Sequence, residues 1–592
     1  MLTQPYMDAF WAFSLSPFNA AIPQFARCDA GSDASAAHSN ACRNMPGDRD
    51  WPSNDAWGEL NSTVGGRLMR GQPLAQVCHG ATLDAGACAA LQDTYNFPEL
   101  YVTDPVNIMS PYWLNNSCSP YAPYASADGS GSSSASCALG NLAQYAIRVT
   151  GVDDVVAGVN FARKHNIRLT IKNTGHDVQG RSAGAGSLGL WMHNLKDISF
   201  IDYSSAKYHG KAARIGAGIE VGEAYQAAHK SGLTITGGNC PSVGVAGGWF
   251  PGGGHGPLAS MYGLGADTTL EFEVVTAHGA VVTATPDNEH SDLYWALSGG
   301  GPGNFGVVLS ITAKAWPDMS VAGAVFTFVN TNDETYWKAI RAWMKALLEL
   351  NQIPGLSTAS GFSSQGFTMN FATLPGGTQE MLNKALAPYM AQLKSLDIMM
   401  VANTTQVHSS FFDHYSAFVE SPPINITMAA RMIPASLVQD DSKLDTLVST
   451  MRTLTDEQGV FALISNNVSL SRAGVAAESN SVLPAWRDTL FLANFGQYVS
   501  NGKPWRDLSA DQTRVNNWQT LLRDQTPGGG SYANEATFND ATWKEDYFGA
   551  NYDRLLSIKR SYDPEGLFWA NTAVGSDANW VQQPDGRLCR PK

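Results

Sequence analysis

Two glycine-rich stretches hold the residues best suited to chemistry. Residues 171–182 place His176 directly after Gly175 in a turn-rich segment. Residues 237–256 contain nine glycines in twenty positions around a single cysteine, Cys240. Glycine at this density costs conformational entropy and cannot fill a core, so it is expected where the backbone lies against a ligand. We interpret both stretches as parts of a site for a flat, phosphate-bearing cofactor.

The alternative is that these stretches are plain surface turns, which is the more common meaning of one isolated glycine-rich loop. Here each stretch follows an apolar run that predicts a strand, over residues 167–172 and 233–236. A third cluster, residues 299–306, contains G-x-G-x-x-G, but a predicted helix precedes it and a predicted strand follows it. The dinucleotide-binding fingerprint needs the opposite order. The paired loops therefore favour one shared site of another kind.

Several motifs together resemble the FAD-binding domain of berberine bridge enzyme-like oxidoreductases, in the vanillyl-alcohol oxidase superfamily with its PCMH-type fold. The matching segments are 175–182, 240–244, 252–256, 263–267, 547–559 and 562–564. The resemblance implies FAD bound covalently twice, through His176 to the 8α-methyl group and through Cys240 to C6. It also indicates a fungal-type secreted member.

The same resemblance implies further contacts to FAD. The residues concerned are Asn173, Thr174, Gly175, Asp177, Gly180, Arg181, Ser182, Val243, Gly244, Gly247, Gly248, Gly256, Leu258, Asp267 and Asn551. No metal site is predicted. His176 could instead be an ordinary structural histidine, but a neutral ring nitrogen in a tight loop suits the nucleophile that flavin attachment needs. We interpret His255 as structural, with a cofactor contact as the alternative.

The expected catalytic residues lie in the segment Tyr532-Ala-Asn534-Glu535. Members of the family often have Tyr-x-Asn-Tyr here, and the second tyrosine accepts the proton. Glu535 replaces that tyrosine, and a carboxylate is a competent base whose pKa burial would raise toward the working range. An exposed loop glutamate is the alternative. Weaker candidates are Tyr498, Arg431 and His408.

The eight cysteines give conflicting indications about Cys240. Eight cysteines can all pair, so counting alone places Cys240 in a disulfide. Its sequence motif instead assigns Cys240 to the flavin, which leaves seven cysteines and therefore at least one unpaired thiol among them. Six cysteines lie in the first 137 residues, and the spacings of Cys78 with Cys88 and of Cys118 with Cys137 suit local loops. With N-glycosylation sequons at five asparagines, this predicts a secreted, disulfide-bonded protein. The sequons begin at Asn61, Asn115, Asn403, Asn425 and Asn467.

Bulk composition excludes other classes. A chain of 592 residues can bury a large core in two or more domains. The net charge of −14 argues against nucleic-acid binding, and no run of apolar residues is long enough to span a membrane. We expect a monomer whose partners are a small-molecule substrate and O2.

The helices and strands expected around these residues indicate an α+β protein. We expect an N-terminal disulfide-containing extension with few regular elements over 1–137, in which 127–136 is a low-complexity linker. A two-part FAD-binding domain follows over 138–317 and returns over 541–592. Residues 318–540 form an inserted substrate domain, an antiparallel sheet covered by helices. Predicted helices include 152–165, 334–349 and 379–396, and predicted strands include 145–149, 307–313 and 321–329.

The resemblance implies an oxidase that moves hydride from an alcohol to flavin N5 and reduces O2 to H2O2. The substrate class would be a carbohydrate or a phenolic or other secondary metabolite. Two alternatives stay open: a dehydrogenase that passes electrons to a quinone, and a flavin-loaded binding protein with little turnover.

Overall fold

Three large β-sheets and their covering helices build the part of the chain that the structure describes. This computed structural model describes residues 41–110, 116–121, 137–418 and 423–591. Cys28, the sequon at Asn115 and the low-complexity segment 127–136 lie outside these ranges. Within them, no helix has the length and apolar character that crossing a bilayer requires.

The first sheet has four strands in the order β1-β2-β4-β3. Their bounds are β1 Leu68–Arg70, β2 Tyr145–Arg148, β3 Leu169–Lys172 and β4 Leu188–Trp191. Strands β2, β4 and β3 are parallel, and helix α5 (Val152–Lys164) connects β2 to β3. Acidic residues in the first turn of α5 and basic residues in its last turn complement the helix dipole. The predicted strand and helix here are confirmed.

The second sheet is antiparallel, in the order β5-β6-β10-β8-β9, and β7 pairs with the end of β10. Its bounds are β5 Ile198–Ser204, β6 His209–Gly216, β7 Leu233–Ile235, β8 Thr269–Val275, β9 Val281–Ala284 and β10 Val307–Pro317. Helices α6 (Val221–Lys230) and α9 (Ser291–Leu297) pack beside it. The His176 loop leaves the end of β3, and the Cys240 loop leaves the end of β7. The predicted strand before each loop is therefore confirmed.

The N-terminal segment is more regular than expected. It contains helices α2 (Asn54–Thr63), α3 (Ala85–Thr94) and α4 (Glu99–Val102), and its strand β1 pairs antiparallel with β2. Trp57 of α2 packs with Phe161 of α5, because an edge strand and an amphipathic helix bury apolar surface best against an existing sheet. The expectation of few regular elements is wrong for these residues.

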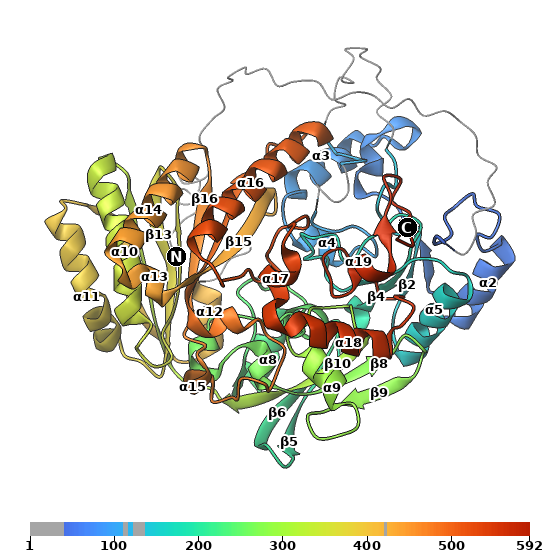
Figure 1. Ribbon diagram of the computed structural model, residues 1–592, viewed down its shortest axis with the longest axis horizontal. Coiled ribbons are helices and arrows are strands. Elements are labelled where there is room, and N and C mark those ends of the chain that lie inside the picture. The colour runs from blue at the N-terminus through green and yellow to red at the C-terminus, as the bar shows by residue number, and fades with distance from the viewer. Residues whose placement is uncertain (1–40, 111–115, 122–136, 419–422, 592) are drawn as a thin grey trace. The chain divides into compact units, whose positions relative to one another are not determined.

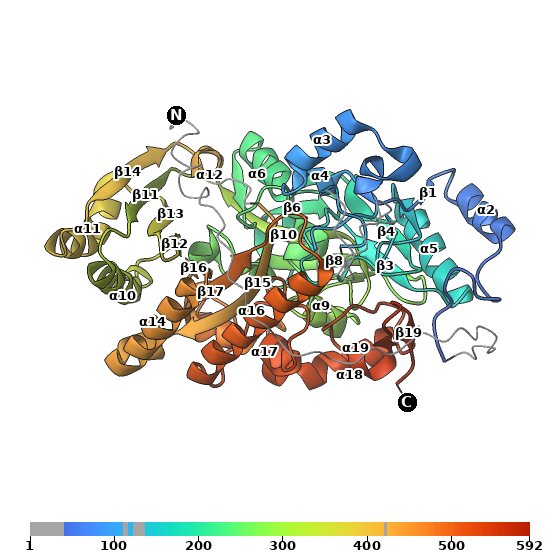
Figure 2. The same cartoon turned by 90° about the horizontal axis from the view of Figure 1, so that it is seen from above.

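The third sheet is the antiparallel sheet of the expected substrate domain, in the order β14-β11-β13-β12-β16-β17-β15. Its bounds are β11 Val321–Val329, β12 Ser357–Phe362, β13 Gly366–Pro375, β14 Met400–His408, β15 Ile426–Pro434, β16 Val460–Ser465 and β17 Thr489–Tyr498. Helices α10 (Asp333–Leu350), α11 (Gln379–Ser395), α14 (Asp441–Asp456) and α16 (Trp505–Gln525) cover one face, as Figures 1 and 2 show. The predicted helices over 334–349 and 379–396 are confirmed.

Strand register decides what the two faces of this sheet carry. Asn494 of β17 pairs with Ala430 of β15, and Gly496 pairs with Met428. Directly opposed residues share a face in an antiparallel pair. Ala429 and Phe495 belong to the core under the helices, so Met428, Ala430 and Asn494 point away from the helices.

The C-terminal segment lies on the sheets of the FAD-binding half. Helix α17 (Trp543–Phe548) is followed by α18 (Tyr552–Tyr562), which lies beside α9, red against green in Figure 1. Phe568 forms a parallel bridge with Leu169 of β3, and the guanidinium of Arg554 stacks on the Trp295 ring at 3.7 Å. The predicted α+β class, with helices over an antiparallel sheet, is confirmed.

Candidate flavin site

The two glycine-rich loops bring His176 and Cys240 together. The Nε2 atom of His176 lies 3.8 Å from the Cys240 Sγ and 2.8 Å from the Ser242 Oγ. Burial, and to a lesser extent the charge of Lys172, lower the pKa of His176 to about 4. The imidazole is therefore neutral near pH 7, as a nucleophilic ring nitrogen must be.

Cys240 is present as a thiol, which resolves the conflict left by counting cysteines. The local pairs Cys78–Cys88 and Cys118–Cys137 are disulfides, as their spacing predicts. Cys42 and Cys589 are also in disulfide form. Cys240 is thus in the thiol form from which a thioether bond could be made, and that bond stays a prediction.

Asp177 organises the backbone after His176. Its carboxylate accepts hydrogen bonds from the backbone N–H groups of Gln179, Arg181 and Ser182, at 3.2, 3.0 and 2.6 Å, and from the Ser182 hydroxyl at 2.6 Å. These bonds close the turn that contains Gly180, whose φ of +72° suits glycine. Asp177 and Ser182 thus shape the loop, and their contact with the cofactor stays a prediction.

The loops present buried polar atoms that the described residues leave without partners. These are the Asn173 Oδ1 and the Arg181 Nε and Nη2. A Cβ added at Gly248 would meet no heavy atom within 4 Å, so the backbone is open to a flat group there. Unpaired guanidinium donors suit phosphate or carbonyl oxygens. The residues present therefore fit a flavin nucleotide.

Glycines also allow the loops to pack on one another. A side chain at Gly256 would overlap the backbone of Gly237, and one at Gly244 would overlap Asn173. Residues Val245–Trp249 form a π-helical turn, η5, a conformation frequent at functional sites. Gly244 and Gly247 lie against Asn173, whereas Leu258 and Thr174 are buried. Their cofactor contacts, and those of Gly175 and Val243, stay predictions.

Two of the predicted cofactor residues also make side-chain contacts within the protein. The Asp267 carboxylate accepts hydrogen bonds from two guanidinium nitrogens of Arg487, at 2.8 and 2.9 Å. It also accepts one from the Asn480 side-chain amide at 2.7 Å. Asn551 donates to the carbonyl oxygens of Ser481 and Val482. Both connect the FAD-binding half with the loop before β17, and their contacts with the cofactor stay predictions.

Glu535 lies between two residues that the sequence did not connect with it. Its Oε1 accepts from the His255 Nε2 at 2.9 Å, and its Oε2 accepts from the Asn494 Nδ2 at 2.7 Å. His255 is 4% exposed, whereas Glu535 retains 28% exposure. The carboxylate is therefore the reachable member, with His255 behind it. His255 contacts Glu535, and its interpretation as a structural residue stays a prediction.

The expected direction of the Glu535 pKa shift is wrong. Burial does raise the pKa, but the charge of His255 and the hydrogen bonds from His255 and Asn494 outweigh it and lower the pKa below the usual value. The exposed-loop alternative is also excluded. Asn494 carried no motif signal, because its role depends on strand register.

Tyr532 and Asn534 belong to the same segment as Glu535 and contact each other there. The Asn534 Nδ2 donates to the Tyr532 Oη at 3.0 Å and to the Gly248 carbonyl at 3.3 Å, so it joins the segment to the second loop. Burial, with the nearby charge of Glu535, raises the pKa of Tyr532, so its phenol stays protonated. The Asn534 Oδ1 is buried without a partner among the described residues.

The three weaker candidates for the catalytic base lie in different places. Tyr498 shares the sheet face of Asn494, and burial raises its pKa. Arg431 is on the opposite face and is paired with Asp546 at 2.6 Å, away from Glu535. His408 ends the edge strand β14. Tyr498 therefore lies on the side of the sheet that Glu535 contacts, and Arg431 does not.

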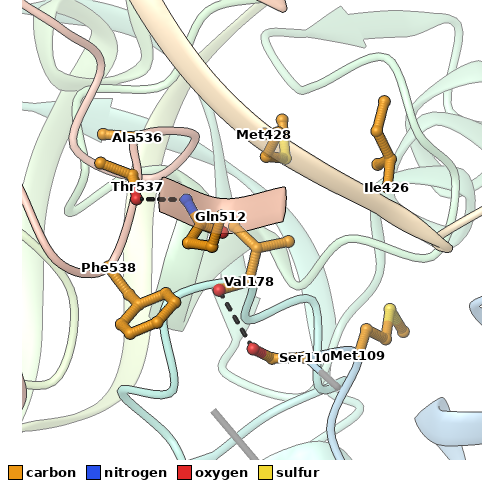
Figure 3. A pocket seen from close by; sticks show the side chains of 9 residues that line it. All are labelled: Met109, Ser110, Val178, Ile426, Met428, Gln512, Ala536, Thr537 and Phe538. Carbon is orange, nitrogen blue, oxygen red and sulfur yellow. Dashed lines mark hydrogen bonds between the residues drawn. The ribbon is translucent and has the colours of Figure 1, made fainter. Parts of the chain in front are cut away.

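A pocket adjoins the loop that carries His176 and the segment that carries Glu535. This inner pocket is lined by Val178, Ala536 and Phe538, by Ile426 and Met428 of β15, and by Gln512 of α16 (Figure 3). The space between its lining atoms is about 280 Å³, which includes open solvent. The Gln179 side chain donates to the Ala536 carbonyl at 2.9 Å and ties the two segments together. No group of His, Cys, Asp or Glu in the described ranges could hold a metal ion.

Comparisons with known proteins agree with this geometry. A family model described as FAD binding domain matches residues 143–285, and one described as berberine and berberine like matches 531–575. The chain is 38% identical over 565 residues to FAD-linked oxidoreductase patO of Penicillium expansum, covering 94% of this chain and 96% of that protein. It is also 38% identical to VAO-type flavoprotein oxidase VAO615 of Thermothelomyces thermophilus, covering 93% and 96%.

A solved structure supports the same assignment. The crystal structure of VAO-type flavoprotein MtVAO615 from Myceliophthora thermophila C1 superposes with a TM-score of 0.87 at 38% identity. The match covers 93% of this chain and 100% of that one. The predicted fold class, an FAD-binding domain with an antiparallel-sheet substrate domain, is confirmed.

Proposed function

The chain belongs to the berberine bridge enzyme-like family of FAD-linked oxidoreductases, and we propose that it is an oxidase whose FAD is bound through both His176 and Cys240. The observation that carries this proposal is the 3.8 Å contact between the His176 Nε2 and the Cys240 Sγ, at the meeting of two glycine-rich loops. The 8α-methyl group and C6 belong to the same benzenoid ring of a flavin, so the residues that would bond to them must lie near each other, as His176 and Cys240 do.

The proposed reaction oxidises an alcohol group of a small molecule. FAD supplies the hydride acceptor when bound. Glu535 takes the hydroxyl proton as the hydride leaves, and its low pKa keeps it ionised and ready to accept. Asn494 and His255 hold the carboxylate in place through its two oxygens.

We propose O2 as the electron acceptor, so turnover releases H2O2. The name of the relative VAO615, a flavoprotein oxidase, supports this choice. The proposed substrates are carbohydrates or phenolic and other secondary metabolites. Peroxide release during substrate screening supports the oxidase; reduction of a quinone without peroxide would favour a dehydrogenase, and no turnover would favour a binding protein.

The attachment is tested by denaturing the protein. Acid-precipitated wild type should stay yellow, because a covalent bond survives unfolding. His176→Ala and Cys240→Ala should each retain one bond, and the double variant should release the flavin. Complete release from the wild type would refute the proposal, and release from His176→Ala alone would remove Cys240 from the attachment.

We also propose that the protein is secreted and acts as a monomer. The disulfides Cys78–Cys88 and Cys118–Cys137 support secretion, because such bonds persist in oxidising compartments. Recovery of the protein in the culture medium, and its mass in solution, test these two points.

A further inference from the structure

The Ser242 hydroxyl lies between the two residues to which the flavin would be attached. Its Oγ is 2.8 Å from the His176 Nε2 and 3.6 Å from the Cys240 Sγ. Ser242 is 4% exposed, and within the described residues its hydroxyl has no other hydrogen-bond partner. A buried hydroxyl depends on such partners, because water does not reach it. The three groups therefore form one short hydrogen-bonded chain, from imidazole through hydroxyl to sulfur.

Main-chain hydrogen bonds hold the backbone around Ser242. The Val243 N–H donates to the Cys240 carbonyl at 3.4 Å, which closes a turn and places Ser242 beside Cys240. In the first turn of α6, the Gly222 N–H donates to the Pro241 carbonyl at 2.9 Å. Neither bond uses the Ser242 side chain. Replacing that side chain should therefore remove the hydrogen-bonded chain and leave the loop in position.

The neutral His176 ring can join this chain in two ways. In the first, Nε2 carries the proton and donates to the Ser242 oxygen, so Nδ1 is a bare nucleophile. The Ser242 hydroxyl then donates its own proton to the Cys240 sulfur, where it favours the thiolate. In the second, the hydroxyl donates to Nε2, Nδ1 carries the proton, and the thiol donates to the Ser242 oxygen. The hydroxyl thus links the reactive state of Nδ1 with that of the sulfur.

The His176 Nδ1 is also the accessible ring nitrogen. No hydrogen bond from the described residues reaches it, and it is not among their buried atoms without a partner. The Nε2 instead contacts Ser242 and Cys240. A bond from Nδ1 to the flavin would leave these contacts in place, whereas a bond from Nε2 would remove them. The arrangement therefore favours Nδ1 as the attached nitrogen.

We propose that Ser242 is a positioning residue for flavin attachment, which presents the His176 Nδ1 as the nucleophile and makes the Cys240 sulfur reactive with it. The inference rests on the proposed bicovalent attachment and adds the residue that controls it. At His176, an imidazole N–H bond and a methyl C–H bond break and a C–N bond forms. At Cys240, the S–H bond and a ring C–H bond break and a C–S bond forms. Each attachment passes two electrons and two protons to O2, which yields H2O2.

The test compares the rates at which the two attachments appear. The full-length chain is purified at successive times after expression begins, and its flavin-carrying peptides are quantified by mass spectrometry. Ser242→Ala should slow attachment at both His176 and Cys240 roughly 10- to 100-fold, the size expected when a hydrogen bond to a charged group is lost. Ser242→Thr keeps the hydroxyl and should attach flavin at both residues nearly as fast as the wild type. Total FAD content and thermal unfolding check that each variant folds.

Tyr415→Phe is the matched control. The Tyr415 hydroxyl donates to the Asn239 carbonyl of the same loop at 2.7 Å and takes no part in the hydrogen-bonded chain. Its loss should leave both attachment rates nearly unchanged. In addition, NMR spectra of the wild-type histidyl–flavin peptide should show the bond at Nδ1.

Three results would overturn the inference: a bond at Nε2, slowing of only one attachment or of neither in Ser242→Ala, and equal slowing in Tyr415→Phe. The last would mean that any disturbance of the loop has the same effect. A wild type without attached flavin would refute the proposed attachment, and this inference with it. A bicovalent wild type beside an unaffected Ser242→Ala variant would refute the inference alone.

Discussion

At the scale of single residues, the contacts of Glu535 suit its proposed role as the base, at the position where the family resemblance places a tyrosine. A tyrosine must lose a proton before it can accept one, and burial raises the pKa of such phenols. Glu535 is held ionised by His255 and Asn494, so it needs no prior activation. The low pKa makes it a weaker base, which precise placement must compensate.

Changing Glu535 to Gln should slow flavin reduction by substrate about 10²–10⁴-fold, because the amide keeps the size but cannot accept the proton. Flavin content should not change. Anaerobic stopped-flow spectroscopy measures the rate. A reduction slowed less than about 10-fold would move the role to Tyr498.

Asn494→Ala tests the cause of the low pKa of Glu535. Asn494 donates to the carboxylate at 2.7 Å and lowers its pKa, so its loss should raise the pKa and move the acidic limb of the pH–rate profile to higher pH. Activity depends on the ionised form, which is lost as pH falls through the folded-state pKa. If the acidic limb does not move, a group other than Glu535 determines its position.

At the scale of elements, the site depends on contacts between the two domains. The face of β15 and β17 opposite the helices carries Asn494 and Met428, while Asp267 of the FAD-binding half pairs with Arg487 just before β17. The Asp267 side chain is fully buried. The pair therefore fixes the position of the sheet over the glycine-rich loops.

Asp267→Ala should lower the free energy of unfolding by about 3–5 kcal/mol, because it leaves the Arg487 charge buried without its partner. Asp202→Ala is the control, since its pair with Lys211 is exposed and should contribute little. Denaturation in urea measures both. Equal small losses would show that the buried pair is not needed to hold the domains together.

At the scale of the whole molecule, the N-terminal segment supports the flavin loop from outside. The Lys172 ammonium donates to the carbonyl oxygens of Tyr101 and Asp104 at 3.0 and 2.6 Å, and the Met109 N–H donates to the Gly175 carbonyl at 3.1 Å. Burial lowers the pKa of Lys172 to about 8. The same segment contains helix α3, in which Cys88 forms a disulfide with Cys78.

The folded structure also distinguishes among the sequons. Asn403 is exposed on the edge strand β14 beside exposed Val401 and Val407, so a glycan there would cover an open sheet edge. The Asn467 amide instead donates to the Asn351 carbonyl at 2.9 Å. Peptide mapping of secreted protein should find a glycan at Asn403 and none at Asn467. The reverse occupancy would contradict this expectation.

The sequence by itself determined the local features. Glycine density, the cysteine–proline context and the histidine after Gly175 identified both flavin loops, and apolar runs located the strands before them. Cysteine spacing predicted Cys78–Cys88 and Cys118–Cys137. Each of these signals is contained within a few neighbouring residues, where propensity and chain geometry act directly.

Only the tertiary structure decided how distant residues act on one another. His255 and Glu535 meet across 280 positions, and Asn494 reaches the carboxylate because strand register turns it away from the helices. The direction of the Glu535 pKa followed from those contacts, since burial alone would have raised it. Electrostatic and packing energies depend on distances in space, and separation along the chain does not specify them.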